Sequence, residues 1–398
     1  MLDSRIISTL GNSLTASPTM AMSALASKMK AEGKDVLSFA VGEPDFPTPP
    51  HICEAAKRAI DDGQTKYTPA SGTPALRKAI VEATQRDLGV SYEPEQVVVS
   101  NGGKHALMNI WRILLNPGDE VVIFAPYWVS YPDQVQIAGG VPVVVPTSGD
   151  NDFQPDLEEL KAKITRRTVA ILLNSPSNPA GSVFTRETIE GIARIAQSNG
   201  LTIVSDEIYK HILFDGRSHV SPAQLDDDLR ERTIIADGVA KTYAMTGWRI
   251  GWLIAPKHFA KQAGSLQSQE TSNPCSISQA AALAALTGPQ DSVGQMRQAF
   301  EERRNFIVPA LNAMAGINCP NPGGAFYVLP DITAHLGRTL KGQQIKDSFD
   351  FCSYLLDEAL VSTVHGSASG SEGYFRISFA CSMEQIKEGL RRIEQALS

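Results

Sequence analysis

Residues 169–206 read VAILLNSPSNPAGSVFTRETIEGIARIAQSNGLTIVSD, and the fold class follows from how this stretch is built. The runs 169–173 and 201–204 do not alternate apolar with polar residues, which is typical of strands buried on both faces. Between them, apolar residues recur at the spacing of one helix face, and Asn199-Gly200 is a typical helix end. The stretch therefore predicts buried strands joined by a helix, as in a parallel sheet covered by helices.

The same pattern extends from about residue 50 to about residue 285. Further apolar, β-branched runs lie at 97–99, 121–124, 143–145, 233–236 and 250–255. Helix-face patterns precede them near residues 52–59 and 76–83. We therefore expect a large α/β domain at residues 48–290, with a mostly parallel, seven-stranded sheet.

The pattern changes after residue 290. Helical patterns at 296–314, 349–360 and 386–397 surround two strand-like runs at 323–329 and 374–380. Strands are fewer here, and they are expected to be antiparallel. The sequence thus predicts a second, smaller α+β domain in the C-terminal part of the chain.

The composition is that of a globular protein. Of the 398 residues, 42% are hydrophobic and 20% are charged, which excludes a disordered chain. The net charge of −7 argues against a nucleic-acid partner. No apolar run approaches the ~20 residues of a membrane helix, and the N-terminus lacks the pattern of a secretory signal. We expect neither a membrane nor a nucleic-acid partner.

The cysteines indicate the compartment. The five are widely spaced, and no Cys-x-x-Cys pair occurs, so neither a disulfide framework nor a metal site is indicated. A reducing cytoplasm is therefore expected. The five are Cys53, Cys275, Cys319, Cys352 and Cys381.

Polar residues follow several of the predicted strands, where ligands bind in open α/β sheets. Gly102-Gly103-Lys104 comes after the run 97–99 and opens a helix. Glycines let a phosphate approach the backbone, and a helix N-terminus supplies free N–H groups. An ordinary turn is the alternative, but a lysine in the first helical turn breaks the dipole rule, as functional residues tend to do. Patterns for dinucleotide binding, a nucleophile elbow and a Walker loop are absent.

Three further candidates lie at strand ends. Residues 174–181 contain two prolines and a glycine, which fix a rigid loop and aim Asn178. Asp206 directly follows a buried run, where a helix cap or a salt bridge is the alternative to a function. Lys241, eight residues before Arg249, has apolar and aromatic neighbours. Burial would lower its pKa and make it a nucleophile, whereas a lone lysine is usually a solvated surface group.

Together these residues are the set that pyridoxal phosphate chemistry needs. A lysine forms an imine with the cofactor, and a carboxylate keeps the ring nitrogen protonated, so that the ring withdraws electrons from the substrate. Phosphate-binding groups and a stacking aromatic side chain fix the cofactor's orientation.

The sequence resembles the class I aminotransferases of the fold-type I pyridoxal-phosphate enzymes, and most of all their bacterial aspartate aminotransferase subgroup. The resemblance runs from about residue 17 to the C-terminus and rests on eight motifs in the family's order. The motifs are Gly42-Glu43-Pro44-Asp45-Phe46, Lys66-Tyr67, Gly102-Gly103-Lys104, residues 125–131, residues 174–181, residues 206–209, residues 241–251, and Phe375-Arg376-Ile377-Ser378.

The resemblance implies roles for the matched residues. Lys241 would bind the cofactor covalently and move the substrate proton, and Asp206 would pair with the pyridine nitrogen. The other implied cofactor-binding residues are Gly102, Gly103, Lys104 and Arg249 at the phosphate, Trp128 stacked on the ring, Asn178 and Tyr209 at its phenolic oxygen, and Tyr67 at the phosphate of the neighbouring subunit.

The resemblance also implies the substrate site and the assembly. Arg376 would clamp the substrate α-carboxylate as a planar fork, with Gly42, Trp128 and Asn178 beside it. The family works as homodimers with shared active sites. Its small domain combines the N-terminal segment, here residues 1–47, with the C-terminal part, here residues 291–398.

Some positions depart from the family. Asp237 stands where asparagine is common, and Gly238 and Ala240 stand where many relatives carry serine or threonine. Ala180 replaces a usual threonine, and His365 replaces a usual proline. None of these changes removes a group that the mechanism needs, so they bear on cofactor affinity and specificity.

The implied activity is transfer of the amino group of aspartate to 2-oxoglutarate by a ping-pong mechanism. Relatives that use aromatic amino acids, alanine or prephenate share the motifs and stay open as alternatives. A carbon–sulfur β-lyase on the same scaffold is a further alternative, since it begins with the same imine. A non-enzymatic regulator of this fold would carry an extra DNA-binding domain, for which the chain has no room.

A dicarboxylic substrate needs a cation for its second carboxylate. Residues 267–274, where another subgroup's partner-chain arginine might fall, contain neither Arg nor Lys. Lys104 is then the best cation, with Ser17 and Thr19 as possible donors. The alternative is that Lys104 only helps to hold the phosphate.

Overall fold

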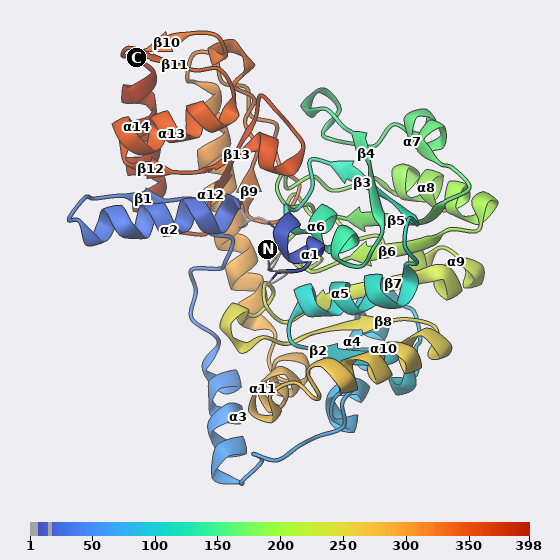
Figure 1. Ribbon diagram of the computed structural model, residues 1–398. Coiled ribbons are helices and arrows are strands. Elements are labelled where there is room, and N and C mark those ends of the chain that lie inside the picture. Colours follow the sequence, from blue (N-terminus) through green and yellow to red (C-terminus); the bar gives the residue numbers. More distant parts are fainter. Residues whose placement is uncertain (1–6, 15–17) are drawn as a thin grey trace, which may run out of the picture.

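The computed structural model describes residues 7–14 and 18–398, and a seven-stranded sheet forms its centre (Figure 1). The order is β2-β8-β7-β6-β5-β3-β4, and all neighbouring strands are parallel except the two pairs that β8 forms. The predicted sheet is confirmed, and each of the seven apolar runs contributes one strand. The strands are β2 (Val97–Ser100), β3 (Glu120–Ala125), β4 (Val141–Pro146), β5 (Thr168–Asn174), β6 (Thr202–Asp206), β7 (Thr233–Gly238) and β8 (Gly251–Ile254).

Helices cover both faces of the sheet, which is why its strands are apolar throughout. In β3, Val121 and Ile123 pack with α5, α6 and α10, whereas Val122 and Phe124 pack with α7 and α8. A third group of helices, α3, α4 and α11, packs against the β2 edge. These helices are α3 (Pro50–Asp61), α4 (Pro74–Leu88), α5 (Gly103–Leu114), α6 (Ser130–Ile137), α7 (Leu157–Lys163), α8 (Arg186–Asn199), α10 (Lys257–Glu270) and α11 (Ser276–Thr287). In the described ranges, no helix is both long and apolar enough to cross a membrane.

The C-terminal part forms a second body of packing. A three-stranded sheet of order β13-β14-β9 is antiparallel throughout, as predicted. Long helices pack around it with a shared apolar core. The elements are α12 (Asp291–Asn312), β9 (Tyr327–Val328), α13 (Ser348–Ala359), β13 (Val364–His365), β14 (Phe375–Ser378) and α14 (Met383–Leu397).

The N-terminal segment joins this second body. β1 (Leu37–Ser38) pairs in parallel with β12 (Val361–Ser362). Helix α2 (Pro18–Ala31) lies beside these strands, where Met22 and Met29 pack with Leu356 and Val364 (Figure 1). The packing agrees with a small domain made from both ends of the chain. The division at residues 47/48 and 290/291 stays a prediction.

The strand expected at 323–329 is wrong in length, because only Tyr327–Val328 forms β9. The residues before it pair elsewhere: Phe214 donates its N–H to Gly323, and Ala325 donates its N–H to Ile212. Residues 323–328 therefore form two separate sets of backbone hydrogen bonds. The first ties the C-terminal body to the segment after β6, and the second completes the small sheet.

Candidate active site

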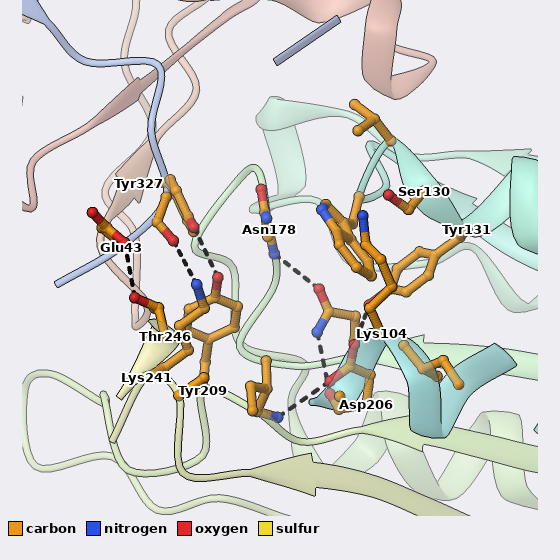
Figure 2. Close-up of a pocket in the computed structure, with 18 of the residues that line it drawn as sticks. Glu43, Lys104, Ser130, Tyr131, Asn178, Asp206, Tyr209, Lys241, Thr246 and Tyr327 are labelled. Carbon is orange, nitrogen blue, oxygen red and sulfur yellow. Dashed lines mark hydrogen bonds between the residues drawn. The ribbon is translucent and has the colours of Figure 1, made fainter. Parts of the chain in front are cut away.

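A cavity of about 320 Å³ opens at the carboxyl ends of β5, β6 and β7 (Figure 2). Both bodies of the molecule line it. Figure 2 shows Lys241 and Tyr209 on one side of the cavity and Lys104 with Tyr131 on the other. The residues proposed from the sequence that line the cavity are Gly42, Gly103, Lys104, Trp128, Asn178, Asp206, Tyr209, Lys241, Arg249 and Arg376.

Lys241 enters the cavity from the turn after β7. Its Nζ donates a hydrogen bond of 2.5 Å to the carbonyl oxygen of Gly42 and lies 5.9 Å from the centre of the Tyr209 ring. Loss of contact with water, together with repulsion from Arg376, lowers the pKa of Lys241 to about 8, although Glu43 opposes the shift. The neutral amine that a nucleophile requires is therefore far more accessible near pH 7 than it is in a surface lysine.

Asp206 is the last residue of β6 and is buried. Its Oδ2 accepts a 2.7 Å hydrogen bond from the Tyr131 hydroxyl, and its Oδ1 accepts a 3.3 Å hydrogen bond from the N–H of Ile208. Burial raises the pKa of Asp206 to about 6, and these two hydrogen bonds limit the rise. A buried carboxylate of this kind favours a ligand that brings a positive charge.

Arg376, on β14, is buried above the ring of Tyr327, with 4.8 Å between its guanidinium carbon and the ring centre. Its Nη1 donates a 3.0 Å hydrogen bond to Oδ1 of Asn178, and its Nη2 donates to the carbonyl oxygen of Ala40. Its Nε has no hydrogen-bond partner among the described residues. The guanidinium is thus held rigidly and keeps an unused donor, which suits a carboxylate ligand.

Two further contacts fix the walls of the cavity. The hydroxyl oxygens of Tyr209 and Tyr327 are 2.8 Å apart, which joins the segment after β6 to β9. The Asn174 side chain accepts a 2.9 Å hydrogen bond from the N–H of Asn178 and donates a 3.1 Å hydrogen bond to the carbonyl oxygen of Asp206. The loop that carries Asn178 is therefore bound to the strand that carries Asp206.

Lys104 and Arg249 form a positive region at the start of α5. The Lys104 ammonium lies 4.8 Å from the centre of the Trp128 ring, and Arg249 donates a 2.9 Å hydrogen bond to the carbonyl of Thr246. Lys104 keeps part of its surface open to solvent, but partial loss of contact with water and repulsion from Arg249 both lower its pKa. Within the described residues neither cation forms an ion pair, and the N-terminus of α5 adds free N–H groups. An anion would satisfy all of these groups.

Sequence reasoning missed Tyr131 and Tyr327 as site residues. Tyr131 lies three positions after Trp128, and the two rings meet edge to face with centroids 5.3 Å apart. Helical spacing within the quoted motif could therefore have identified Tyr131. Tyr327 reaches the cavity only through long-range pairing of the C-terminal body, which no local pattern reveals.

Four proposed residues lie away from the cavity or outside the described structure. The Tyr67 side chain is not in the cavity and is 92% exposed. Gly102 is buried beside the Arg249 guanidinium and does not line the cavity itself. Ser17 lies outside the described residues, as does the side chain of Thr19. In the ranges that the structure covers, no cluster of three or more metal-ligating side chains could hold a metal ion.

Comparison with known proteins identifies the family. The model described as aminotransferase class I and II matches residues 34–393, which is most of the chain. This chain belongs to that family. The enzyme is 46% identical over 383 residues to an aspartate aminotransferase from Geobacillus stearothermophilus, with 96% of each chain covered. It is 47% identical over 380 residues to an aspartate/prephenate aminotransferase from Cereibacter sphaeroides, with 95% of each chain covered.

Solved structures agree with this assignment. The aspartate aminotransferase from Rhizobium meliloti is 43% identical and superposes with a TM-score of 0.95, with 98% of each chain covered. The Thermus thermophilus aspartate aminotransferase with maleate is 40% identical, with a TM-score of 0.93 over 99% of this aminotransferase and 100% of that chain. The fold is therefore that of fold-type I transferases.

Two departures from the family have a physical explanation. Gly238 packs so tightly that a Cβ would lie 2.9 Å from Cα of Gly251, so a serine would not fit here without a shift. Asp237 is buried and forms an ion pair with Lys210, with 2.8 Å between Oδ2 and Nζ. In this aminotransferase the charged residue at 237 therefore has its own counter-ion.

Proposed function

We propose that this aminotransferase uses pyridoxal 5′-phosphate to transfer the amino group of aspartate to 2-oxoglutarate by a ping-pong mechanism. One observation carries the proposal: a single cavity holds the low-pKa amine of Lys241, the carboxylate of Asp206, and the cations Lys104 and Arg249, and none of the last three forms an ion pair with another described residue. The names of the relatives support aspartate as the amino donor.

The cavity fits the cofactor group by group. The positive region at the start of α5 suits the phosphate dianion, and the Asp206 carboxylate suits a protonated ring nitrogen. When bound, the cofactor supplies an electron-withdrawing ring that stabilises negative charge at the substrate Cα. The residues proposed to hold it are Gly102, Gly103, Lys104 and Arg249 at the phosphate, Trp128 over the ring, Asn178 and Tyr209 at its oxygen, Asp206 at its nitrogen and Lys241 at its aldehyde carbon.

The chain's own residues perform the proton transfers. Lys241, in its neutral form, would accept the proton from the substrate Cα and deliver it to the cofactor's C4′ carbon, and the transfer would run in the opposite direction in the second half of the reaction. Asp206 holds the proton on the ring nitrogen, and Tyr131 keeps the Asp206 carboxylate oriented. Arg376 binds the substrate α-carboxylate beside Asn178, and the Gly42 segment closes the other side.

Substrate choice is proposed to depend on Lys104. Its side chain is exposed at the cavity and is held over Trp128, so it can reach an anion in the cavity. The maleate named with the Thermus thermophilus structure is a dicarboxylate, which supports a second carboxylate site in this family. The alternatives are that Lys104 serves only the phosphate, or that aromatic amino acids, alanine or prephenate are the natural substrates.

The enzyme is proposed to be a cytoplasmic homodimer. Tyr67 is an aromatic residue with 92% of its surface exposed, although it lies in a motif shared with the family. A partner subunit that covers Tyr67 would explain why an aromatic side chain stands there, and would bring it to the partner's phosphate site.

Donor and acceptor profiling tests the function. With pyridoxal 5′-phosphate, the purified protein is expected to convert aspartate and 2-oxoglutarate to oxaloacetate and glutamate, with parallel lines in a double-reciprocal plot, as a ping-pong reaction requires. A β-lyase would instead release pyruvate from cystathionine without an oxo acid. Absence of aspartate turnover, with fast turnover of phenylalanine or alanine, would overturn the substrate assignment.

A further inference from the structure

A group of buried charges lies directly behind Asp206. Lys210 Nζ is 2.8 Å from Asp237 Oδ2 and 3.5 Å from Asp87 Oδ2, and His211 Nε2 is 3.0 Å from the same Asp87 oxygen. Lys210 and Asp237 are 9% and 3% exposed, so their charges are almost removed from water. A charge buried to this degree is rare unless it is paired.

The strand register brings this group to the active site. Asp206 on β6 pairs with Ala236 on β7, so Asp237 is one residue further along the neighbouring strand. Asp237 lines the cavity, and its Oδ1 accepts a 2.7 Å hydrogen bond from the N–H of Gly238. The two buried carboxylates therefore lie on neighbouring strands and border the same cavity, but their side chains leave opposite faces of the sheet, because they are one residue out of register. Asp237 comes four residues before Lys241.

Two neighbouring carboxylates oppose each other's ionisation. The charge of Asp237 raises the pKa of Asp206, in addition to the larger effect of burial. Burial also raises the pKa of Asp237, and the Lys210 ammonium opposes that rise. An asparagine at position 237 would accept the same N–H without adding a charge, so Asp206 would have no neighbouring carboxylate and Lys210 would have no charge to neutralise.

We propose that Lys210 is a positioning residue for the cofactor: by neutralising Asp237, it leaves Asp206 free to stay ionised opposite the ring nitrogen. The proposal rests on pyridoxal phosphate as the cofactor. Lys210 contacts neither cofactor nor substrate in this assignment and acts only through Asp237 and Asp206.

The other groups that face Asp206 do not replace Lys210. Tyr131 of α6 donates a hydrogen bond to it, and Tyr209 is a neutral hydroxyl of the following segment. Glu207 also raises the pKa of Asp206; its Oε2 lies 3.1 Å from Nε2 of His219, and the pKa of Glu207 is itself lowered by His219 and by Lys210. Lys241 lies on the cavity side, where it is used for covalent binding. On its other side, Lys210 contacts Asp87, which also contacts His211.

The test measures cofactor binding by the apoenzyme against pH. Apoenzyme is titrated with pyridoxal 5′-phosphate from pH 5 to pH 8, and the acid midpoint of the affinity is determined for each variant. Lys210→Met leaves Asp237 unneutralised, so the midpoint is expected to rise by about one pH unit. Asp237→Asn removes a negative charge, so the midpoint is expected to fall by about one unit. The titration of the cofactor's own phosphate is the same for every variant and cancels.

Two controls separate this role from a purely structural one. Lys210→Arg keeps the charge and is expected to keep the wild-type midpoint. The double variant Lys210→Met/Asp237→Asn restores the charge balance, so the midpoint is expected to return to the wild-type value. If Lys210→Met alone does not fold, this double variant tests the role of Lys210 in its place. A common midpoint for all folded variants, with only a lower unfolding temperature of the apoprotein, would overturn the proposal. Wild-type protein that binds no pyridoxal phosphate would instead overturn the proposed function.

Discussion

Lys241 combines two properties that a surface lysine does not have. Its amine is held against the Gly42 carbonyl at 2.5 Å, and its pKa is lowered to about 8 by burial. Lys241→Ala removes both the covalent attachment point and the proton acceptor. We expect the rate of aspartate transamination to fall by about 10⁴-fold or more, with loss of the visible absorption of the lysine-bound cofactor. Near-native turnover in this variant would refute the assignment of Lys241.

The Tyr131–Asp206 hydrogen bond has a pH signature. The bond favours the ionised carboxylate, so Tyr131→Phe is expected to raise the pKa of Asp206 above about 6. The group that holds the ring nitrogen then becomes neutral at a higher pH, and the acid limb of the kcat profile moves upward. Loss of a hydrogen bond to a charged group of about 1.5–3 kcal/mol corresponds to a shift of about one to two pH units.

A nearby tyrosine provides the control for that variant. Tyr127 is in the same motif but does not line the cavity. Tyr127→Phe removes a hydroxyl of the same kind and is expected to leave the acid limb in place. If both variants shift the limb equally, the effect belongs to the loop as a whole and not to the contact with Asp206.

A substitution at Lys104 distinguishes a role in substrate recognition from a role in cofactor binding. If its ammonium binds the distal carboxylate, Lys104→Ser is expected to lower kcat/KM for aspartate by about 10²-fold, and to change the value for phenylalanine far less. Steady-state assays with aspartate, alanine and phenylalanine measure this directly. An equal loss for all donors, together with weaker cofactor binding, would make Lys104 a phosphate residue.

At the scale of elements, the local sequence pattern predicts the strands and helices whose apolar residues are buried by neighbouring elements. The seven sheet strands are apolar because helices cover both faces, and α8 ends at Asn199 with Gly200 as its cap, as predicted. Pattern fails where a segment is shaped by distant partners. Residues 323–326 read as a continuous strand, yet Gly323 and Ala325 bond to residues 214 and 212, and Gly324 donates its N–H to Gly181. Their pairing depends on a segment more than 100 residues away, which periodicity does not encode.

The segment around Gly42 packs so closely against Tyr327 of β9 that the side chain at position 42 cannot be larger than that of glycine without a shift. A Cβ at Gly42 would lie 2.2 Å from the Tyr327 hydroxyl, so any larger residue must displace the strand or the ring. Gly42→Ala is expected to destabilise the protein by about 1–3 kcal/mol and to move the carbonyl that holds Lys241. Thermal unfolding of the apoenzyme and the pKa of the lysine-bound cofactor, read from its absorption, measure the two effects. Unchanged values for both would show that the segment adapts freely.

At the scale of the whole molecule, the exposure of Tyr67 predicts a shared site. Lys241→Ala and Tyr67→Ala subunits, each impaired alone, are expected to regain up to about one quarter of wild-type activity when mixed, because each mixed dimer contains one intact site. Lys241→Ala mixed with Arg376→Ala is the control and is expected to stay inactive, since both residues serve the same subunit's cavity. A fully active monomer in light scattering would contradict the shared site.

The candidate site was predictable only where its residues sit in local motifs. Asn178, Asp206 and Lys241 follow strands, and the sheet edge gathers them, so their proximity follows from topology alone. Tyr327 and the Lys210–Asp237 pair depend on how separate elements pack, and no spacing along the chain reveals them. The roles of the gathered residues stay predictions that the experiments above address.

The pairing of β1 with β12 has a consequence for biosynthesis. It joins residues 37–38 to residues 361–362, so the N-terminal segment cannot reach its native pairing until nearly the whole chain has been synthesised. Until then, Met22 and Met29 lack Leu356 and Val364, the residues that bury them in the finished protein. The seven-stranded sheet and the helices that cover it are made before then and can fold in the meantime. Helix α2 therefore waits for these native neighbours until the polypeptide is nearly complete, and its exposed methionines are a site where a chaperone would bind in the meantime.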